Sequence, residues 1–342
     1  MSQNTSFDIS AHERLKTFLL EREEPQKPGI ELLTPDASTR EYFRIRHNNS
    51  PAIACVYAEP FVEKKQNYLD VTNLFLAAGL PVAKIYDFDG ELGVIILEDF
   101  GNLILRDVLI QSDDEQREKL INEAITLIAR IQAATPKAYE HDSIASRLKF
   151  DEEKLLWELN FFKTHSFESF RKTKLSAADK EGLNKEFTEI SRELESAARV
   201  LCHRDFHAAN LMIDGDQKLR IIDHQDARIG STSYDLVSLL LDRISEPPST
   251  VWIREKRLFF LAEREKLGLE TLDPDEFAAE FRLQTIQRCL KAIGTFSYQS
   301  TFREKLYFIQ FIKPMFQVVL RACERLEKFP VLQKIIEGEM KR

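Results

Sequence analysis

The 342-residue sequence has few cysteines and no long apolar run. Its four cysteines are scattered and include no C-x-x-C pair: Cys55, Cys202, Cys289 and Cys323. This usage predicts reduced core thiols in a cytoplasmic protein. The uncharged apolar stretches, such as residues 93–97, have the length of a strand, and the N-terminus has no secretory signal pattern. We therefore expect no membrane-spanning helix and no membrane partner.

The sequence also lacks the basic excess that is typical of nucleic-acid-binding proteins. Lysine and arginine together number 48 against 56 aspartates and glutamates, which gives a formal net charge of −8. Neither a nucleic acid nor an anionic membrane is a natural partner for that balance. Nothing in the sequence implies an obligate protein partner.

The length exceeds what one hydrophobic core usually supports, so two lobes are expected. Residues 1–30 hold a predicted helix with Ser10 as its N-cap. Three strands are predicted over residues 30–57, then a helix over residues 64–78 with Gly79 past its end. Two more strands meet at the turn signal Asp89-Gly90. This order predicts a small, mainly antiparallel lobe over residues 1–97, with a five-stranded sheet and an N-terminal helix.

The remainder, residues 102–342, is predicted to be helical except for one hairpin. Ser112 and Glu115 have the spacing of a capping box, and residues 150–162 form a second amphipathic candidate. Residues 163–182 are polar and predict a surface excursion. Between the two lobes, at residues 98–101, an apolar strand changes abruptly to acidic residues and glycine. The expected fold is therefore α+β with two lobes.

One segment carries most of the chemistry, residues 201–210, with the sequence L-C-H-R-D-F-H-A-A-N. It supplies an acid, Asp205, an amide five residues later, Asn210, and then a second acid, Asp223, that closes an apolar run. Short apolar runs on both sides predict a loop, a hairpin and a strand. This is the residue order of a phosphoryl-transfer site on a kinase-type scaffold. His203 and Arg204 are expected to hold the loop in place.

Phosphoryl transfer explains why these residue types are needed. The transition state is highly charged, so the protein must position the reactants and supply positive charge through Mg²⁺. Asp205 can orient the acceptor hydroxyl and take its proton. Asn210 and Asp223 are hard oxygen donors suited to Mg²⁺. The sequence thus predicts a phosphotransferase that uses ATP and Mg²⁺ and acts on a small hydroxylated molecule.

Several residues outside this core pattern are weaker candidates. Asp235 precedes an apolar helix face, so it can cap that helix and brace the catalytic loop. Gln225 and Asp226 could hydrogen-bond the vicinal hydroxyls of a sugar or could be turn residues. Glu158 is a candidate for a place beside the acceptor.

The segment resembles the aminoglycoside phosphotransferase and choline kinase superfamily, and within it the bacterial anomeric kinases of N-acetylmuramate and N-acetylglucosamine. Three more stretches support the narrower resemblance: D-A-S-T-R-E-Y-F-R at residues 36–44, D-H-Q-D-A with Y-D-L at residues 223–227 and 234–236, and Q-R-C-L-K-A-I-G-T-F at residues 287–296. The resemblance covers the chain from about residue 34 to the low 320s. It implies a two-lobed protein-kinase-like fold with a hinge at residues 98–101. Backbone groups of Leu97, Glu98 and Asp99 would then pair with adenine.

The sequence departs from the kinase pattern at the phosphates. Residues 52–57, on the strand that usually carries the phosphate-contacting lysine, contain none. No glycine-rich loop and no G-x-x-x-x-G-K-[ST] motif occur. Ser38 and Thr39 with their amides could cradle phosphate instead. Arg40 or Arg44 could supply the charge, on the strand face opposite Phe43 and Ile45. Two solvated surface arginines are the alternative.

The resemblance also implies where an acceptor binds. His207, Gln225 and Asp226 are the nearest hydrogen-bonding candidates in sequence. If the acceptor carries a lactyl carboxylate, as N-acetylmuramate does, Arg288 and Lys291 could meet it, since residues three apart share a helix face. Both could equally be surface charges. Ala209 stands where these kinases more often have arginine. Other acceptors, namely an aminoglycoside, choline or homoserine, and a non-catalytic pseudokinase module remain alternatives.

Overall fold

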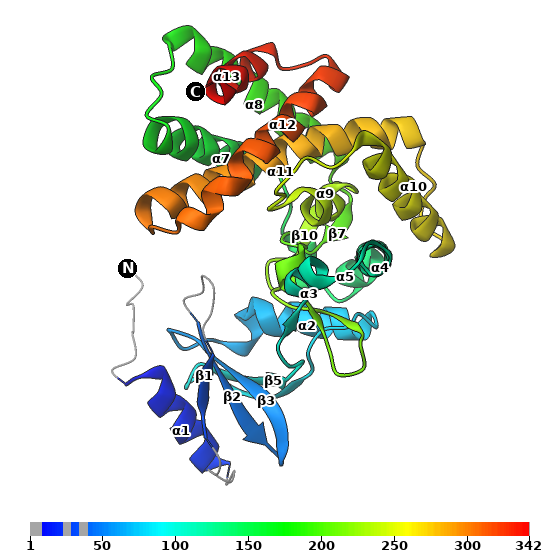
Figure 1. The fold of residues 1–342 in the computed structure, drawn as a ribbon. Coiled ribbons are helices and arrows are strands. Elements are labelled where there is room, and N and C mark those ends of the chain that lie inside the picture. Colours follow the sequence, from blue (N-terminus) through cyan, green and yellow to red (C-terminus); the bar gives the residue numbers. More distant parts are fainter. Residues whose placement is uncertain (1–8, 23–28, 34–39, 342) are drawn as a thin grey trace. The chain divides into compact units, whose positions relative to one another are not determined.

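The computed structural model describes residues 9–22, 29–33 and 40–341, which fold into two compact units. The first unit is the described part of Met1–Ile110 together with Ala209–Asp226, and the second is Gln111–Ala208 with Ala227–Arg342. Strands predominate in the first and helices in the second (Figure 1), so the predicted α+β class is confirmed. The grouping places residues 209–226 in the first unit because their hairpin pairs with strand residues there. The hinge at residues 98–101 stays a prediction.

An antiparallel sheet of five strands forms the centre of the first unit, in the order β1-β2-β3-β5-β4. The strands are β1 (Glu31–Leu33), β2 (Glu41–His47), β3 (Ser50–Val56), β4 (Ile85–Asp89) and β5 (Val94–Glu98). Side chains alternate along β2 as the sequence predicted. Phe43 and Ile45 are buried on one face, whereas Tyr42 packs in a different cluster, with Cys55 and Leu97.

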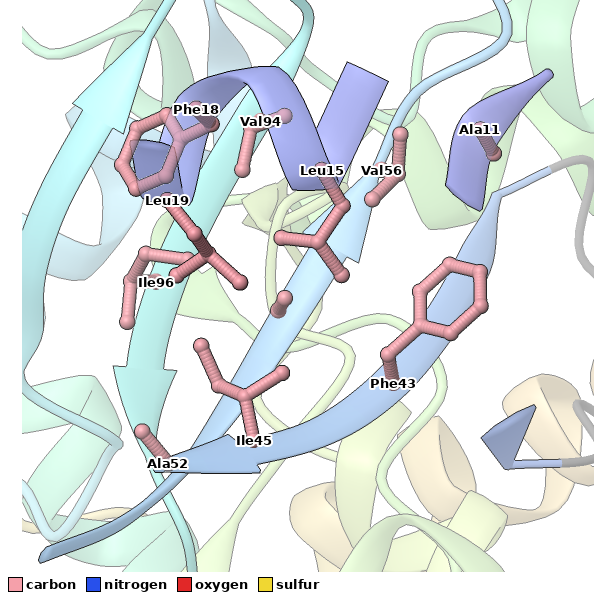
Figure 2. Close-up of a cluster of buried hydrophobic side chains, with 11 residues drawn as sticks. Ala11, Leu15, Phe18, Leu19, Phe43, Ile45, Ala52, Val56, Val94 and Ile96 are labelled. Carbon is pink, nitrogen blue, oxygen red and sulfur yellow. The ribbon is translucent and has the colours of Figure 1, made fainter. Parts of the chain in front are cut away.

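Helix α1 (Ala11–Glu21) covers one face of this sheet. Ser10 caps it as predicted, in a capping box with Glu13, which satisfies backbone donors at both positions. Leu15 and Phe18 are fully buried against the strands, and Figure 2 shows them pointing toward the side chains of the sheet. The apolar face of this helix therefore docks it on the sheet.

The first unit contains several further short elements. They are η1 (Glu63–Lys65), α2 (Asn67–Ala77), β6 (Leu103–Ile104), β8 (Leu211–Ile213) and β9 (Leu219–Ile221), while α3 (Leu105–Gln111) and η3 (Ala208–Asn210) lie at the unit boundaries. Gly79, with a φ of +69°, follows the end of α2 as predicted. Strands β8 and β9 form the predicted hairpin and add to β6 in a three-stranded sheet.

The second unit consists of helices around one short strand pair, β7 (Val200–Cys202) with β10 (Arg228–Gly230). Its helices are α4 (Asp114–Ala133), α5 (Thr135–Glu140), α6 (Ile144–Arg147), α7 (Glu152–Phe162), η2 (Lys163–Phe170), α8 (Ala177–Ala197), α9 (Tyr234–Leu241), α10 (Thr250–Lys266), α11 (Pro274–Phe302), η4 (Leu306–Phe308), α12 (Ile309–Leu326) and α13 (Pro330–Met340). Figure 1 shows α11 running beside α12 and α7. Among the described residues, none of the helices combines the length and the apolar character needed to span a membrane.

Two local predictions for the second unit are wrong. The helix after residue 112 begins one residue later than predicted, with Asp113 as its N-cap, because the Asp113 carboxylate accepts the backbone N–H of Gln116. The surface excursion predicted over residues 163–182 is too long. Residues 163–170 form the π-helix η2, in which Phe167 is fully buried, residues 171–176 form a partly exposed connection, and α8 begins at Ala177.

Helices α7 and α11 approach each other closely at Gly294. A Cβ atom at that position would lie 2.7 Å from the Cα of Phe162 and 3.0 Å from its backbone nitrogen. Since both atoms belong to the backbone of α7, they could not move aside without shifting the helix. Glycine at residue 294 therefore permits the spacing of these two helices.

Candidate active site

The loop that carries Asp205 follows strand β7 and is held by Asp235. The backbone N–H groups of His203 and Arg204 donate to the Asp235 carboxylate, at 2.6 Å and 3.0 Å. Arg204 adopts a φ of +85°, a left-handed conformation that a non-glycine residue keeps only when its surroundings hold it. The prediction that Asp235 braces the loop is confirmed. The predicted cap is wrong, since Asp235 lies in the first turn of α9 and Ser233 is the N-cap residue.

Asp235 is buried, and its burial has an electrostatic cost. Burial raises the pKa of its carboxyl to about 6, against the opposing effects of His203 and the two N–H donors. A raised pKa means that the folded protein binds this proton more tightly than the unfolded chain does.

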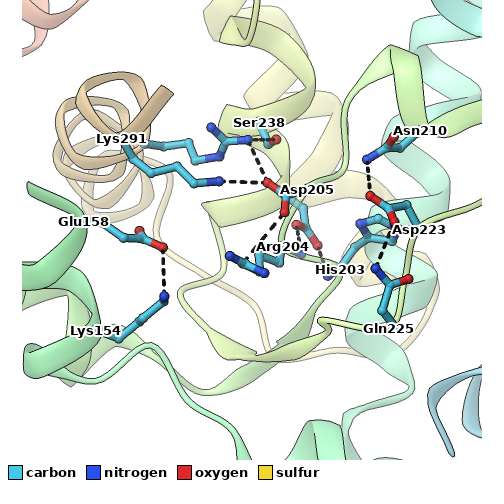
Figure 3. Close-up of polar contacts among 12 residues, drawn as sticks. Lys154, Glu158, His203, Arg204, Asp205, Asn210, Asp223, Gln225, Ser238 and Lys291 are labelled. Carbon is cyan, nitrogen blue, oxygen red and sulfur yellow. Dashed lines mark hydrogen bonds and ion pairs between the residues drawn. The ribbon is translucent and has the colours of Figure 1, made fainter. Parts of the chain in front are cut away.

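Three cations surround the carboxylate of Asp205 (Figure 3). Lys291 Nζ lies 2.8 Å and Arg288 Nη2 3.4 Å from Asp205 Oδ1, while Arg204 Nε lies 3.8 Å from Oδ2. Burial alone would raise the pKa of Asp205. The charges of Lys291, Arg204 and Arg288 outweigh that effect and hold the pKa well below its usual range. Asp205 is therefore an ionised carboxylate that only accepts hydrogen bonds.

Arg288 is buried, and its guanidinium group binds acidic and hydroxyl groups of the second unit. Its side chain is 3% exposed, pairs with Asp242 at 2.9 Å and donates to the hydroxyl of Ser238 at 3.0 Å. Asp242, which follows the end of α9, is itself buried and ionised with a lowered pKa, since the nearby cations, Arg288 first, outweigh the effect of burial. Arg288 and Lys291 share a face of α11, as predicted, but both side chains bind Asp205.

Glu158 belongs to the same polar region of the second unit. It is buried on α7, accepts a hydrogen bond from Gln287 Nε2 at 2.8 Å and lies 3.9 Å from Lys154 Nζ. Roles for Gln287, Lys154 and Asp242 in this region were not predicted from the sequence. Gln287 and Lys291 are one helical turn apart, and polar residues repeating at that spacing in an otherwise apolar helix are the signal that could have found Gln287.

His207 is a neutral imidazole at neutral pH. Burial, partly opposed by Asp242, lowers its pKa to about 4. Its backbone N–H donates to the carbonyl of Asp205 at 3.0 Å, which makes the turn after Asp205 compact. His207 can therefore offer a hydrogen bond to a ligand but not a positive charge.

The first unit brings the two predicted metal ligands together. Asn210 Nδ2 lies 3.4 Å from Asp223 Oδ2, and the backbone N–H of Ile222 donates to the Asn210 carbonyl. Gln225 Nε2 donates to Asp223 Oδ1 at 2.9 Å (Figure 3). Gln225, which was predicted to bind the acceptor substrate, therefore orients this carboxylate. Asp223 has a φ of +61°, which turns the chain sharply after β9. Asp226, which was also predicted to bind the acceptor substrate, is the last residue of the segment Ala209–Asp226 of this unit.

His224 anchors this segment to α2 and was also missed from the sequence. It is fully buried, and its Nε2 lies 2.7 Å from the hydroxyl of Thr72. Its ring lies against those of Tyr68 and Phe75, with centroids 5.0 Å and 5.3 Å away. The residue after the candidate metal ligand is thereby fixed to a helix. Partners 152 residues apart leave no local pattern from which this contact could be predicted.

The donor set at Asp223 fits Mg²⁺ better than a metal that needs a full protein cage. Within residues 9–22, 29–33 and 40–341, no group of three or more histidines, cysteines and acids is placed to hold a metal. One carboxylate and one amide remain, and Mg²⁺ takes few protein oxygens when phosphate and water supply the rest. Asp223 is 42% exposed, so its oxygens are accessible.

The two candidate phosphate arginines have different partners. Arg40 is largely buried, and its Nη2 lies 3.3 Å from Asp223 Oδ1, so it contacts the candidate metal carboxylate. Arg44 instead binds Asp99 through two hydrogen bonds, at 2.7 Å and 3.2 Å. Asp99 also accepts the backbone N–H of Gly101. Ser38 and Thr39 lie outside the described residues.

The predicted adenine-binding residues lie at the end of β5. The side chain of Leu97 is buried in the cluster around Tyr68 and Phe100. The backbone N–H of Glu98 donates to the carbonyl of Lys84 at 2.9 Å. An adenine contact at Glu98 would therefore use its carbonyl group.

The chain is similar in sequence and in fold to proteins of known families. The model of the phosphotransferase enzyme family matches residues 29–278. An N-acetylmuramate/N-acetylglucosamine kinase of Neisseria meningitidis is 28% identical over 264 residues, 77% of this chain and 76% of the relative. A kinase of the same name from Caulobacter vibrioides is 28% identical over 308 residues, 87% of this chain and 80% of the relative. The crystal structure of choline kinase LicA from Streptococcus pneumoniae matches with a TM-score of 0.55 at 14% identity, covering 91% of this chain and 99% of LicA.

The raised pKa of Asp235 makes stability depend on pH in a defined window. Between about pH 4 and pH 6, the folded protein holds a proton that the unfolded chain has released, so raising the pH destabilises the fold. Relative to Asp235→Asn, the free energy of unfolding of the wild type should fall by about 3 kcal/mol across this window and stay level above it. Denaturant unfolding of both proteins from pH 4 to 7.5 measures this difference. A difference that is constant over the whole range would contradict the assignment.

Proposed function

The chain belongs to the phosphotransferase enzyme family, and we propose that it transfers the γ-phosphoryl group of ATP, with Mg²⁺, to the C1 hydroxyl of an N-acetylated amino sugar, N-acetylmuramate or N-acetylglucosamine. As a member of that family it is a small-molecule kinase. The two relatives named as N-acetylmuramate/N-acetylglucosamine kinases support the choice of acceptor, since each aligns with more than three quarters of this chain.

The positive charge around Asp205 is the observation that supports a neutral or anionic sugar as the acceptor. Lys291, Arg288 and Arg204 compensate this carboxylate, and the neighbouring Glu158 has Lys154 within 3.9 Å. A site for choline or an aminoglycoside would present uncompensated acidic groups to attract an ammonium group. Compensated charge suits a neutral or anionic sugar, which is bound by directional hydrogen bonds.

In this proposal, Asp205 binds the hydroxyl group of the acceptor. Its ionised carboxylate accepts the hydroxyl hydrogen bond and orients the oxygen toward the phosphorus. The new O–P bond forms as the bond from the γ-phosphorus to the ADP oxygen breaks, and the hydroxyl proton passes to the Asp205 carboxylate. The depressed pKa makes Asp205 a weak base, so orientation is its larger contribution. Lys291, 16% exposed, is better placed than the buried Arg288 to meet a lactyl carboxylate.

Asn210 and Asp223 are proposed to hold Mg²⁺, which would neutralise charge on the transferring phosphates. Gln225 and His224 keep the Asp223 carboxylate oriented, one by a hydrogen bond and one by anchoring the backbone to α2. Arg40 replaces the missing phosphate lysine in this proposal, because it already binds the same carboxylate. Arg44 is occupied by Asp99 and fixes this residue directly after β5, next to Leu97 and Glu98 at the end of the strand.

The roles of Asp205 and Asp223 separate in kinetics. Asp205→Asn should leave the Kd for ATP within a few fold, whereas turnover should fall on the order of 10² to 10⁴. Asp223→Ala should weaken Mg²⁺-dependent ATP binding as well as turnover, and EDTA should abolish transfer in the wild type. Asp216→Ala, which removes an exposed charge from the same hairpin, is the matched control. Near-normal turnover of Asp205→Asn would remove that residue from the mechanism.

The two arginines give a second pair of variants. Arg40→Ala should raise the Kd for ATP by on the order of tenfold or more, because a charged phosphate contact is lost. Arg44→Ala should change it far less, and Arg46→Ala, exposed on the same strand, serves as the control. Calorimetric titration with ATP and Mg²⁺ measures all three. An unchanged Kd in Arg40→Ala would mean that another residue supplies the charge.

The acceptor is tested by product analysis. The purified protein is supplied with ATP, Mg²⁺ and, separately, N-acetylmuramate, N-acetylglucosamine, an aminoglycoside or choline, and the products are examined by ³¹P NMR. We expect a 1-phosphate of one or both amino sugars. Transfer only to the aminoglycoside or choline would overturn the sugar assignment, and absence of ATP consumption with every acceptor would favour a non-catalytic module.

A further inference from the structure

A cavity of about 290 Å³ lies within the second unit and includes none of the candidate active-site residues. Its walls come from the end of α9, the segment before α10, and helices α10, α11 and α12. Of its fourteen lining residues five are arginines and none is acidic: Arg254, Arg257, Arg282, Arg321 and Arg325. A protein with a net charge of −8 thus gathers five cations around one small space.

Over residues 9–22, 29–33 and 40–341, none of these five arginines forms an ion pair with an acid within 4.0 Å. Arg321 spends one donor on the carbonyl of Pro248, at 3.1 Å. The Nε of Arg257 is buried and has no hydrogen-bond partner in the described structure. A ligand that supplies an acceptor would remove the cost of this buried donor.

The electrostatics of Arg257 show that the charges act on one another. Burial lowers the pKa of Arg257, and the charges of Arg282 and Arg254 lower it further, while Asp275 alone opposes them. Arg254 and Arg257 are three residues apart on α10, so they share a helix face. Repulsion of this kind destabilises the empty cavity and is relieved by an anion.

The remaining lining is apolar. Phe281 lies beneath Arg257, whose guanidinium carbon is 5.6 Å from the ring centroid, and Val251 and Val318 also line the cavity. An inorganic anion would use only the arginines. A ligand with an anionic group and an apolar or ring portion would use the whole surface, and the cavity has the size of a small-molecule site.

The geometry points to a second ligand site in this protein, which binds a small organic phosphate with its phosphate on the arginines and its apolar portion on Phe281 and the two valines. Phosphate is favoured because several arginine forks can share its three terminal oxygens. This inference does not depend on the proposed acceptor, since it rests on residues of α10, α11 and α12 that have no assigned part in the reaction.

Phenyl phosphate is a probe with both required portions. Isothermal titration of the full-length protein with phenyl phosphate, and with inorganic phosphate in parallel, should show binding of both at low salt. Phenyl phosphate should bind several fold more tightly, and added NaCl should weaken both. If neither probe binds the wild type, the proposal is overturned.

Variants locate the binding. Arg257→Ala and Arg282→Ala should each weaken phenyl phosphate binding by about tenfold, as should the pair Arg321→Ala with Arg325→Ala, whose exposed positions preserve the fold. Lys313→Ala removes one exposed charge from α12 outside the cavity and should have no effect. Arg40→Ala, which removes the proposed phosphate contact of the nucleotide site, should also bind the probe normally. Loss of binding in Arg40→Ala but not in the cavity variants would place the probe in the nucleotide site, and equal affinity in every variant would likewise overturn the proposal.

Discussion

The polar residues of the second unit are arranged around the ion pairs of Asp205. A carboxylate largely removed from water needs nearby positive charge to remain ionised, and α11 supplies it through Lys291 and Arg288. Arg288 in turn needs Asp242 at the end of α9. The first turn of α9 holds Asp235, which fixes the backbone before Asp205. The carboxylate of Asp205 therefore determines where two helices must place their polar residues.

The first unit meets a similar requirement with different means. The Asp223 carboxylate is oriented by Gln225, contacted by Arg40 and followed by a histidine that is anchored on α2. The side chain of Asp223 is partly exposed, whereas the ring of the next residue, His224, is fully buried. The Asp223 carboxylate thus stays accessible while the backbone beside it is immobilised, which favours a site that is ready before a ligand arrives.

Sequence reasoning succeeded where the signal was local. The hairpin after Asn210, the capping box at Ser10 and the alternation of Phe43 and Ile45 each depend on residues close together in the sequence. It failed where two structures have the same local signal, as at Asp113, which took the cap predicted for Ser112. Residues 163–170 are mostly polar, and the spacing of a π-helix differs from the usual helical repeat, so this helix left no recognisable pattern. The partners of Arg288 and His224 lie tens of residues away, and the sequence contained no information on which acid or hydroxyl each would meet.

The close approach at Gly294 affects more than the packing of two helices. Glu158 lies on α7, whereas Gln287 and Lys291 lie on α11, so the hydrogen bond from Gln287 to Glu158 spans the same interface that Gly294 narrows. A methyl group at residue 294 would widen this interface through the backbone of Phe162, one turn of helix beyond Glu158. The absence of a side chain at one position thus sets the distance between a buried acid on one helix and a row of donors on the other. Among relatives that share this helix crossing, a larger residue at that place would be expected together with a longer polar side chain opposite it.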